Sequence, residues 1–440
     1  MNNGEKIYKI IEDLFPINRS LTGEGVRETL NYIKKQIPVE IKEVDSGYKA
    51  FDWTVPKEWK VNDAYIANSK GEKIIDFKKL NLHLMGYSIP IDKKMYLDEL
   101  EKHLYSIKEI PDAVPYITSY YSPNWGFCLS HNKRQTLEDD IYSVKIDSEH
   151  FNGVMNYGEM LIKGESEEEI LLSTYVCHPS MVNNELSGPA VLTYIVKWLL
   201  NRENKYSYRI LFAPETIGSI VYINKNLENL KKNLKAGMVL TCLAKDSHYS
   251  YVATKYGDSY IDNIMEKESE ISKNIKKYSF LDRGSDERQY NSANVDLPVI
   301  AFSREKFGEY KEYHNSNDDL SITSPEILND SFEMVKKIIN SIEKNNFTKL
   351  KSNRKAVNKA LKIKVCCEPQ LGKRGLYPNI STTKTKELVQ DMMNIIAYSD
   401  GTNTDNQIMK YANINKDKFS KIVSKLFNAD IVERIEVKNV

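Results

Sequence analysis

Polar side chains that could bind a metal or transfer a proton follow several apolar segments of the chain. His178 comes directly after the segment "EEILLSTYVC", and Glu185 follows just before a Gly-Pro pair that opens a helical pattern. Glu215 follows "YRILFAP", and His314 stands in the polar segment "EYHNSNDDL". Histidine nitrogens and carboxylate oxygens are ligands of zinc in catalytic sites. Glu215 could stay a free carboxylate beside such an ion and take a proton from its bound water.

Apolar segments and helical patterns alternate through the middle of the chain, and these elements must hold the polar residues in place. Such an alternation predicts an α/β fold with a mainly parallel sheet that helices cover on both faces. Ligands of an open parallel sheet bind beyond the carboxyl ends of its strands, so we expect His178 and Glu215 at one edge. The predicted strands span residues 168–176, 208–213, 236–243 and 297–303, and the predicted helices span 188–202, 219–233 and 324–346.

The segment before this alternation has a different composition. Residues 41–142 combine Tyr, Trp, Pro and short apolar stretches with turn residues roughly every ten positions, which predicts a small inserted β-rich domain. The catalytic domain then comprises residues 1–40, with a first helix that ends near Gln36, and residues 143–350.

The C-terminal part of the chain differs again. Residues 351–375 are rich in Lys and Arg, which predicts a basic connector. Residues 376–440 contain three short helical patterns followed by the apolar segment "IVERIEV". This order resembles a winged helix-turn-helix.

The overall composition is that of an ordinary globular protein with two or three domains. The chain has 440 residues, 41% of them hydrophobic and 28% charged, and a formal net charge of +1. No stretch approaches the ~20 apolar residues of a membrane helix, and none of the five cysteines forms a CxxC pair, so we expect a cytoplasmic protein without membrane contact. The near-zero net charge argues against wholesale nucleic-acid binding.

Phrases spread along nearly the whole chain resemble a bacterial and archaeal family of aminopeptidase-like proteins linked to polysaccharide biosynthesis. The order of histidine, "NNELSG", "ETIGS" and "YH" is also similar to that of the co-catalytic zinc aminopeptidases and the related glutaminyl cyclases. The resemblance implies a peptidase-like catalytic domain, a small inserted β domain and a C-terminal winged helix. The phrases that carry it are "LFPINRSLTGEGVRETL", "FDWTVPKEW", "CHPSMVNNELSGP", "GSDERQY", "EYHNS" and "EPQLGKRGLYP".

The chain departs from the aminopeptidase pattern at several metal-site positions. Asn184 stands where the aminopeptidases have a bridging Asp, and Thr216 stands where they have a second Glu. Their third acidic ligand falls near Cys242, and the acid that would orient the first histidine is replaced by Ser180. The resemblance therefore implies one zinc ion rather than two.

The residues that still match the metal-site positions of the pattern suggest which side chains would bind that ion. We expect His178, Glu185 and His314 as metal ligands and Glu215 as the catalytic base, with Asn184 as an alternative metal-site position. The structural alternatives are ordinary ones: a histidine after a strand is often a hydrogen-bonded structural residue, and an acid before a helix can simply oppose the helix dipole.

The segment "GSDERQY" supplies candidates for substrate binding. Asp286, Glu287 and Arg288 could hold the charged end of a substrate, or they could form a salt-linked loop and nothing more. Either role is consistent with the alternation of charges in this segment.

The predicted recognition helix of the winged domain carries several lysines that could contact phosphates. Asp417 and Asp430 dilute this charge, and few residues are suited to reading base edges. We therefore do not expect nucleic acid, and we expect either a homo-oligomer or a protein partner through the winged helix. The lysines are Lys416, Lys418, Lys421 and Lys425.

Three functions fit these observations. The first is a metal-dependent amide hydrolase that acts on a small peptide or an amino-acyl conjugate. The second is a catalytically inactive aminopeptidase fold that binds a ligand or partner, which the replaced ligands Asn184 and Thr216 favour. The third is a transferase or cyclase in glycan assembly, because a fold does not fix its chemistry.

Overall fold

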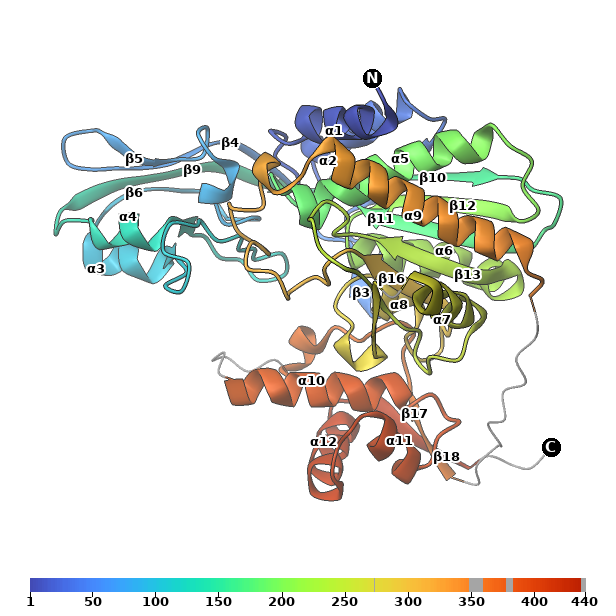
Figure 1. The fold of residues 1–440 in the computed structure, drawn as a ribbon. Helices are drawn as coiled ribbons and strands as arrows, with labels where there is room; N and C mark the ends of the chain where they lie inside the picture. Colours follow the sequence, from blue (N-terminus) through green and yellow to red (C-terminus); the bar gives the residue numbers. More distant parts are fainter. Residues whose placement is uncertain (273, 348–358, 377–382, 437–440) are drawn as a thin grey trace.

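The computed structural model describes residues 1–272, 274–347, 359–376 and 383–436, and its centre is one large sheet (Figure 1). Within these residues eight strands form the sheet in the order β1-β10-β12-β11-β13-β16-β14-β15. Strands β12, β11, β13 and β16 are parallel, whereas β1, β10 and β14 add antiparallel pairings. The strands are β1 (Glu40–Asp45), β10 (Val154–Ile162), β11 (Glu169–Tyr175), β12 (Ser207–Ala213), β13 (Leu234–Leu240), β14 (Tyr249–Val252), β15 (Ile275–Tyr278) and β16 (Val299–Ser303).

Helices cover both faces of this sheet, which confirms the predicted α/β class with a mainly parallel core. Every residue of β11 is buried. Ile170 and Leu172 pack into the core beneath α1, α2, α5, α7 and α9, while Leu171 packs on the opposite face with α6. These helices are α1 (Asn3–Leu14), α2 (Glu24–Lys34), α5 (Ser187–Leu200), α6 (Ile217–Asn233), α7 (Tyr260–Ser272) and α9 (Pro325–Lys344).

The N-terminal helical region differs from the predicted single helix. Two helices, α1 and α2, replace it, and the loop between them contains Pro16 and Gly23. Proline cannot donate the backbone bond that a continuous helix needs at that position. Gly23 has a φ of +102°, a left-handed conformation that favours glycine, and the chain turns there into α2.

The inserted domain contains a second sheet, which projects to one side of the molecule (Figure 1). Its strand order is β5-β4-β9-β6, and residues of β9 alternate between buried and exposed positions, as expected for a sheet with one wet face. Its last strand runs on to Phe151, past the predicted boundary at residue 142, while residues 41–45 pair within the large sheet. The strands are β4 (Glu58–Ala67), β5 (Lys73–Asp76), β6 (Ile91–Tyr96) and β9 (Ile141–Phe151).

Shorter elements complete the inserted region. A small hairpin of β2 and β3 lies against α6, and β7 pairs with β8 in parallel. These elements are β2 (Lys49–Ala50), β3 (Trp53–Thr54), β7 (Leu104–Tyr105), β8 (Phe127–Cys128), α3 (Leu97–Leu100) and α4 (His131–Gln135).

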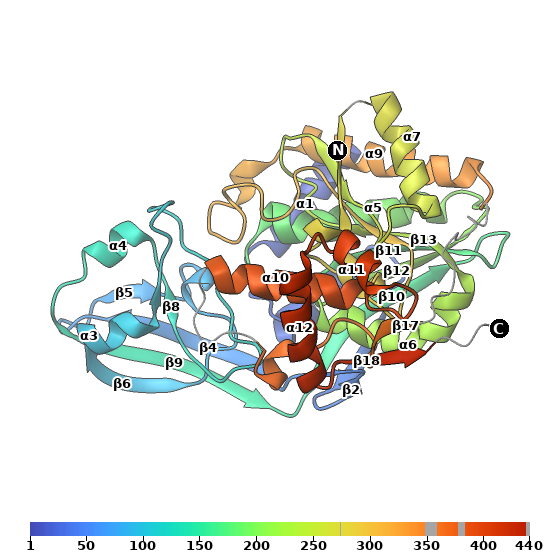
Figure 2. The ribbon, with the colours of Figure 1, turned by 90° about the horizontal axis from the view of Figure 1, so that it is seen from below.

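The C-terminal module has the order expected of a winged helix. Three helices pack together in front of the domain that contains the large sheet (Figure 2), and β17 pairs with β18 in an antiparallel ladder. Of the predicted basic connector, residues 351–358 lie outside the described residues, and residues 359–363 form β17. The elements are β17 (Lys359–Ile363), α10 (Thr383–Tyr398), α11 (Asp405–Tyr411), α12 (Lys416–Asn428) and β18 (Val432–Glu436).

Two further observations bear on the predicted surfaces of the molecule. The Lys418 ammonium on α12 forms an ion pair with Asp391 on α10, at 2.6 Å, so part of the predicted phosphate-binding charge is neutralised within the module. Among the described helices, none combines the length and the apolar character that crossing a membrane requires.

Candidate active site

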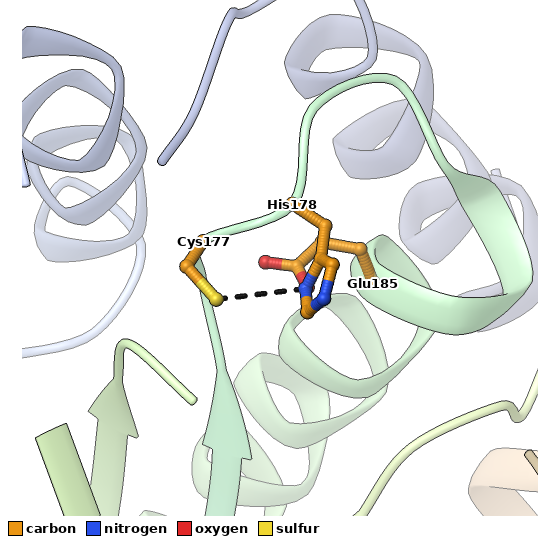
Figure 3. A group of neighbouring side chains, drawn as sticks. All are labelled: Cys177, His178 and Glu185. Atoms are coloured by element: carbon orange, nitrogen blue, oxygen red, sulfur yellow. Dashed lines mark hydrogen bonds and ion pairs between the residues drawn. The ribbon is translucent and has the colours of Figure 1, made fainter. Parts of the chain in front are cut away.

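His178 lies just beyond the end of β11, and a carboxylate holds its ring in place (Figure 3). Its Nδ1 is 2.6 Å from Oε2 of Glu185, and both side chains are almost fully buried. The backbone carbonyl of His178 accepts a hydrogen bond from Nε of the buried Arg19, at 2.9 Å. A carboxylate bonded to one ring nitrogen fixes the tautomer and orientation of a histidine and leaves Nε2 free for other chemistry.

Glu185 reaches this position because hydrogen bonds to Asp318 hold the turn before α5 in place. The turn spans Val182–Leu186, and the carboxylate of Asp318 accepts backbone N–H bonds from its first residues: Val182 at 3.1 Å, Asn183 at 2.6 Å and Asn184 at 2.9 Å. Burial raises the pKa of Asp318 to about 6, against the effect of these bonds, which lower it. Sequence reasoning missed Asp318, although it lies in the same "NSNDD" stretch that follows His314.

His314 lies beside His178 even though the two residues are far apart in sequence. Their ring centres are 5.4 Å apart, and the ring of Tyr116 contacts both. Burial, together with the charge of His178, lowers the pKa of His314 to about 3, so its ring is neutral. Its Nε2 is buried and forms no hydrogen bond with any described residue.

Glu215 approaches His178 from the end of β12. Its Oε2 is 3.6 Å from Nε2 of His178, so the ring lies between Glu185 on one side and Glu215 on the other. Burial raises the pKa of Glu215, although His178 and Arg288 act in the opposite direction. The side chain of Glu215 is 23% exposed, whereas that of Glu185 is fully buried.

The chain after Glu215 makes a strained turn. Thr216 has a φ of +65°, which is unusual for a β-branched residue. Its backbone N–H donates to Oδ1 of Asp286 at 2.7 Å, and the Ser219 hydroxyl donates to the same oxygen at 2.8 Å. Burial, with Glu215 nearby, raises the pKa of Asp286 to about 7. Asp286 thus holds the turn that presents Glu215.

Of the three predicted substrate-binding residues, only one lines the cavity in the structure. Glu287 is fully buried and accepts backbone N–H bonds from Gly284 and Ser285, at 2.9 and 3.3 Å, so it stabilises its own loop. Asp286 likewise faces the protein interior. Arg288 alone of the three lines the large cavity beside Glu215, and one of its amino groups donates to Thr216 Oγ1 at 2.9 Å.

The cavity of about 660 Å³ is lined by three parts of the chain. The catalytic domain supplies Cys177, His178, Glu215 and Arg288, the inserted region supplies an aromatic side, and the segment before α10 supplies polar side chains. The lining includes Trp53, Tyr120 and Tyr121 on the aromatic side and Gln370 and Lys373 on the polar side.

Two of the predicted metal ligands lie close enough together to share one ion. Two imidazoles that bind one tetrahedral zinc ion at about 2.0–2.1 Å have ring centres roughly 5 Å apart, which agrees with the 5.4 Å between His178 and His314. The unpartnered Nε2 of His314 is a free donor, and Oε1 of Glu185 is buried and unpartnered as well. Among the described residues, the donor atoms that all lie within 4.8 Å of one another are those of Cys177, His178 and Glu185, and His314 is not in this group. The ligand role of Glu185 therefore stays a prediction beside its orienting contact with His178.

Neutral side chains stand at two of the positions where the sequence departs from the two-zinc pattern, and Oδ1 of Asn184 is buried without a partner among the described residues. Nδ2 of Asn184 donates to the Tyr175 hydroxyl at 3.1 Å. The Cys242 sulfur lies 3.7 Å from the Tyr310 hydroxyl, and burial raises the pKa of the Cys242 thiol to about 11. These neutral, mutually bonded groups occupy the positions where a two-zinc site needs carboxylates.

The fold and this arrangement of side chains define an aminopeptidase-like protein with a C-terminal winged helix. The chain belongs to the family described as a domain of unknown function (DUF4910), whose model matches residues 8–345, and a winged helix-turn-helix model matches residues 359–434. The family membership inferred from the sequence is thereby confirmed.

Individual relatives agree with this assignment. The chain is 51% identical over 375 residues, 85% of its length and 83% of the relative's, to a Clostridium acetobutylicum protein provisionally described as a polysaccharide biosynthesis protein with an aminopeptidase-like domain. It is similar to a crystal structure of a provisionally named peptidase from Clostridium acetobutylicum, with a TM-score of 0.75 and 44% identity over 98% of this chain and 96% of that one. A zinc aminopeptidase from Bacillus subtilis shares the fold, with a TM-score of 0.57 and 11% identity over 80% of this chain and 96% of that one.

Proposed function

We propose that the protein is a metal-dependent amide hydrolase of the aminopeptidase type, acting on a small peptide or an amino-acyl conjugate in surface polysaccharide metabolism. One observation carries this proposal. Among the described residues that line the cavity, Glu215 is the one carboxylate, and it lies 3.6 Å from the free nitrogen of a histidine whose other nitrogen is held by Glu185. A reachable acid beside an oriented donor set is what amide hydrolysis requires.

The proposed cofactor is a single zinc ion held by His178 and His314. Glu185 can be its third ligand only by giving up its contact with Nδ1 of His178, because Nδ1 and Nε2 point to opposite sides of the ring. When bound, such an ion activates a water molecule and polarises the carbonyl oxygen of the amide. The neutral state of His314 suits this role, because only an unprotonated imidazole nitrogen can bind a metal. At His178 the ion would have to replace a proton, because, although burial lowers the pKa of this histidine, Tyr116, Cys177 and Glu185 raise it well above its usual value.

The side chains then divide the work of hydrolysis. Glu215 takes a proton from the attacking water and passes it to the leaving amine, since it is the carboxylate open to the cavity. Glu185 holds the Nδ1 proton of His178, and Asp318 fixes the turn that carries Glu185. Asp286 holds the backbone N–H of Thr216, so that Glu215 keeps its place beside His178.

The experiment that tests this function combines metal analysis with a substrate screen. The purified protein should hold close to one equivalent of zinc and should hydrolyse members of a panel of short peptides and amino-acylated sugars. His178→Ala should lose both properties, and His131→Ala, which changes a histidine in the inserted domain, should keep both. A parent protein that holds no metal at any tested zinc concentration would reject the proposal.

A second function is favoured by the replaced ligands. Asn184 and Cys242 form a neutral hydrogen-bonded group where a two-zinc site needs carboxylates, which suits a catalytically inactive protein that binds a ligand in the same cavity. Retained metal with turnover favours the hydrolase, whereas ligand binding without turnover favours this alternative. A transferase or cyclase would be recognised by its products, because it consumes the same substrates without releasing the free acid.

A further inference from the structure

Two groups of charged side chains border the cavity, and in each of them two cations share one buried acid. Glu368 accepts a bond from Nε of Arg283 at 3.2 Å and lies 3.6 Å from Nε of Arg288. Asp52 is likewise shared by two neighbouring cations: its Oδ1 accepts a bond from Arg374 at 2.6 Å and lies 2.7 Å from Nζ of Lys373.

The acids of both groups are buried, and one cation of each group lines the cavity. The side chains of Glu368 and Asp52 are 8% and 5% exposed, whereas those of Arg288 and Lys373 are 32% and 44% exposed. Only the latter two line the cavity. Because each acid is already bonded to a more buried arginine, Arg288 and Lys373 keep N–H groups that can donate to a ligand in the cavity.

Two other acids near Arg288 do not line the cavity. Asp286 is committed to the backbone N–H of Thr216 and to Ser219, and Glu287 is committed to two backbone N–H groups of its own loop. Glu215 lines the same cavity, but on the proposed function it acts on the amide.

We propose that the substrate carries an anionic group, a carboxylate or a phosphate, on the far side of the amide from the metal, and that Arg288 and Lys373 bind it. Arginine and lysine are the residues that bind such groups through charge-assisted hydrogen bonds. The inference rests on the proposed function for the position of the amide, but the binding of the anion itself does not require turnover.

The aromatic side of the cavity accounts for the rest of such a substrate. Trp53 and Tyr121 pack edge to face, with ring centres 5.5 Å apart, and the Trp53 indole donates to the backbone oxygen of Glu368 at 2.7 Å. These rings offer an apolar surface beside the cations, which suits a sugar ring or an apolar side chain. The ligand is therefore a compact molecule with one anionic end and one flat or apolar face.

This arrangement makes the winged-helix module part of the binding site. Glu368 and Lys373 lie between β17 and α10, within the residues that the winged-helix model matches. Arg283 also donates to Asn394 on α10 at 2.8 Å, so the same contacts that dock the module position Arg288. Glu368 is accordingly a positioning residue for anion recognition.

Binding measured by calorimetry on the full chain tests the inference without any need for catalysis. The carboxylate probes are N-acetyl dipeptides with a free C-terminal carboxylate, compared with the same dipeptides as C-terminal amides. The phosphate probe is N-acetylglucosamine 6-phosphate, compared with N-acetylglucosamine. One anionic form should bind about tenfold or more tightly than its neutral counterpart, and the preference should shrink as salt is added.

Three variants locate the effect. Lys373→Met should reduce the preference while leaving the Asp52–Arg374 pair to dock the module, and Arg288→Gln should reduce it while binding of the neutral probes is kept. Lys364→Met, which removes a lysine of the same module that pairs with Asp430 instead, should leave the preference unchanged. Melting curves of each variant verify that it folds.

The binding results test anion recognition independently of the proposed hydrolase activity. Equal binding of anionic and neutral probes, or no binding of any anionic probe, overturns the inference even if the protein hydrolyses neutral amides. A clear preference for one anionic probe that Lys373→Met abolishes supports it, even if no hydrolysis is found and the proposed function fails. A preference that survives in both Lys373→Met and Arg288→Gln also overturns it.

Discussion

Replacing Asp318 with Asn should loosen the turn that carries Glu185. In the structure one carboxylate oxygen accepts the N–H groups of Val182 and Asn183, and the other accepts that of Asn184. An asparagine keeps one acceptor oxygen but presents an NH₂ group where the second oxygen was. In its better orientation it leaves the buried N–H of Asn184 facing another donor.

The magnitude follows from the number of groups that lose a partner. A buried donor left without an acceptor costs about 1–3 kcal/mol, and here the N–H of Asn184 and one N–H of the new amide are both affected. Asparagine also avoids the cost of burying a charge, which raises the pKa of Asp318, so the expected net loss of stability is about 1–2 kcal/mol. Metal affinity should fall by about 10–100-fold as well, because the orientation of His178 depends on this turn.

The assay is urea unfolding followed by circular dichroism, together with zinc titration against a competing chelator. Asp319→Asn is the matched control: Asp319 is the N-cap of a short exposed helix, where asparagine caps as well as aspartate. We expect a lower unfolding midpoint for Asp318→Asn and a nearly unchanged midpoint for the control. If Asp318→Asn unfolds at the midpoint of its control and binds zinc equally well, the turn does not depend on Asp318.

Three further predictions concern the site and the docking of the modules. Glu215→Gln should lower hydrolysis by roughly 10²–10⁴-fold while zinc content stays constant, as measured by initial rates and metal analysis; full activity would remove Glu215 from the mechanism. His314→Ala should melt at one temperature with or without a chelator, whereas the parent should melt lower once the chelator has removed its ion. Burial raises the pKa of Asp52, but hydrogen bonds from Arg374 and Lys373 outweigh this and hold the pKa below its usual value. The ionised carboxylate therefore stabilises the fold above about pH 4, and this stabilisation is lost as the pH falls further. Trp53 fluorescence should report this loss in the parent but not in Asp52→Asn, and equal acid curves would contradict it.

The arrangement of strands and helices was predictable from the sequence because their apolar patterns are long and regular. The segment 168–176 became β11, and the helical pattern at 188–202 became α5. The pattern before Gln36 was misread as one helix because amphipathic spacing continues on both sides of Pro16. The start of the inserted sheet could not be placed from composition, since residues 41–45 and the strands after them have similar residues but pair with different partners.

The candidate site was predictable only in part. The sequence pointed to His178, Glu215 and His314, and the structure brings these three together. It could not show that Glu185 bonds the ring of His178, because a carboxylate before a helix looks the same whether it binds a metal, a histidine or the helix N-terminus. Asp318 and Glu368 act through contacts between segments distant in sequence, and no local pattern reveals such contacts.

Gln370, Gly372 and Lys373 form one wall of the cavity and are synthesised after the residues of the other walls. The cavity therefore becomes complete late in translation. Domains generally fold as units during synthesis, the N-terminal ones first. The catalytic residues up to His314 can therefore assemble while the segment that closes the cavity is still being translated or lies in the exit tunnel. A nascent chain would hold its histidines and Glu215 in place, yet it would lack Lys373 and the support that Glu368 gives to Arg288. The complete cavity would then form only after this later segment has been translated and has packed against the earlier domain.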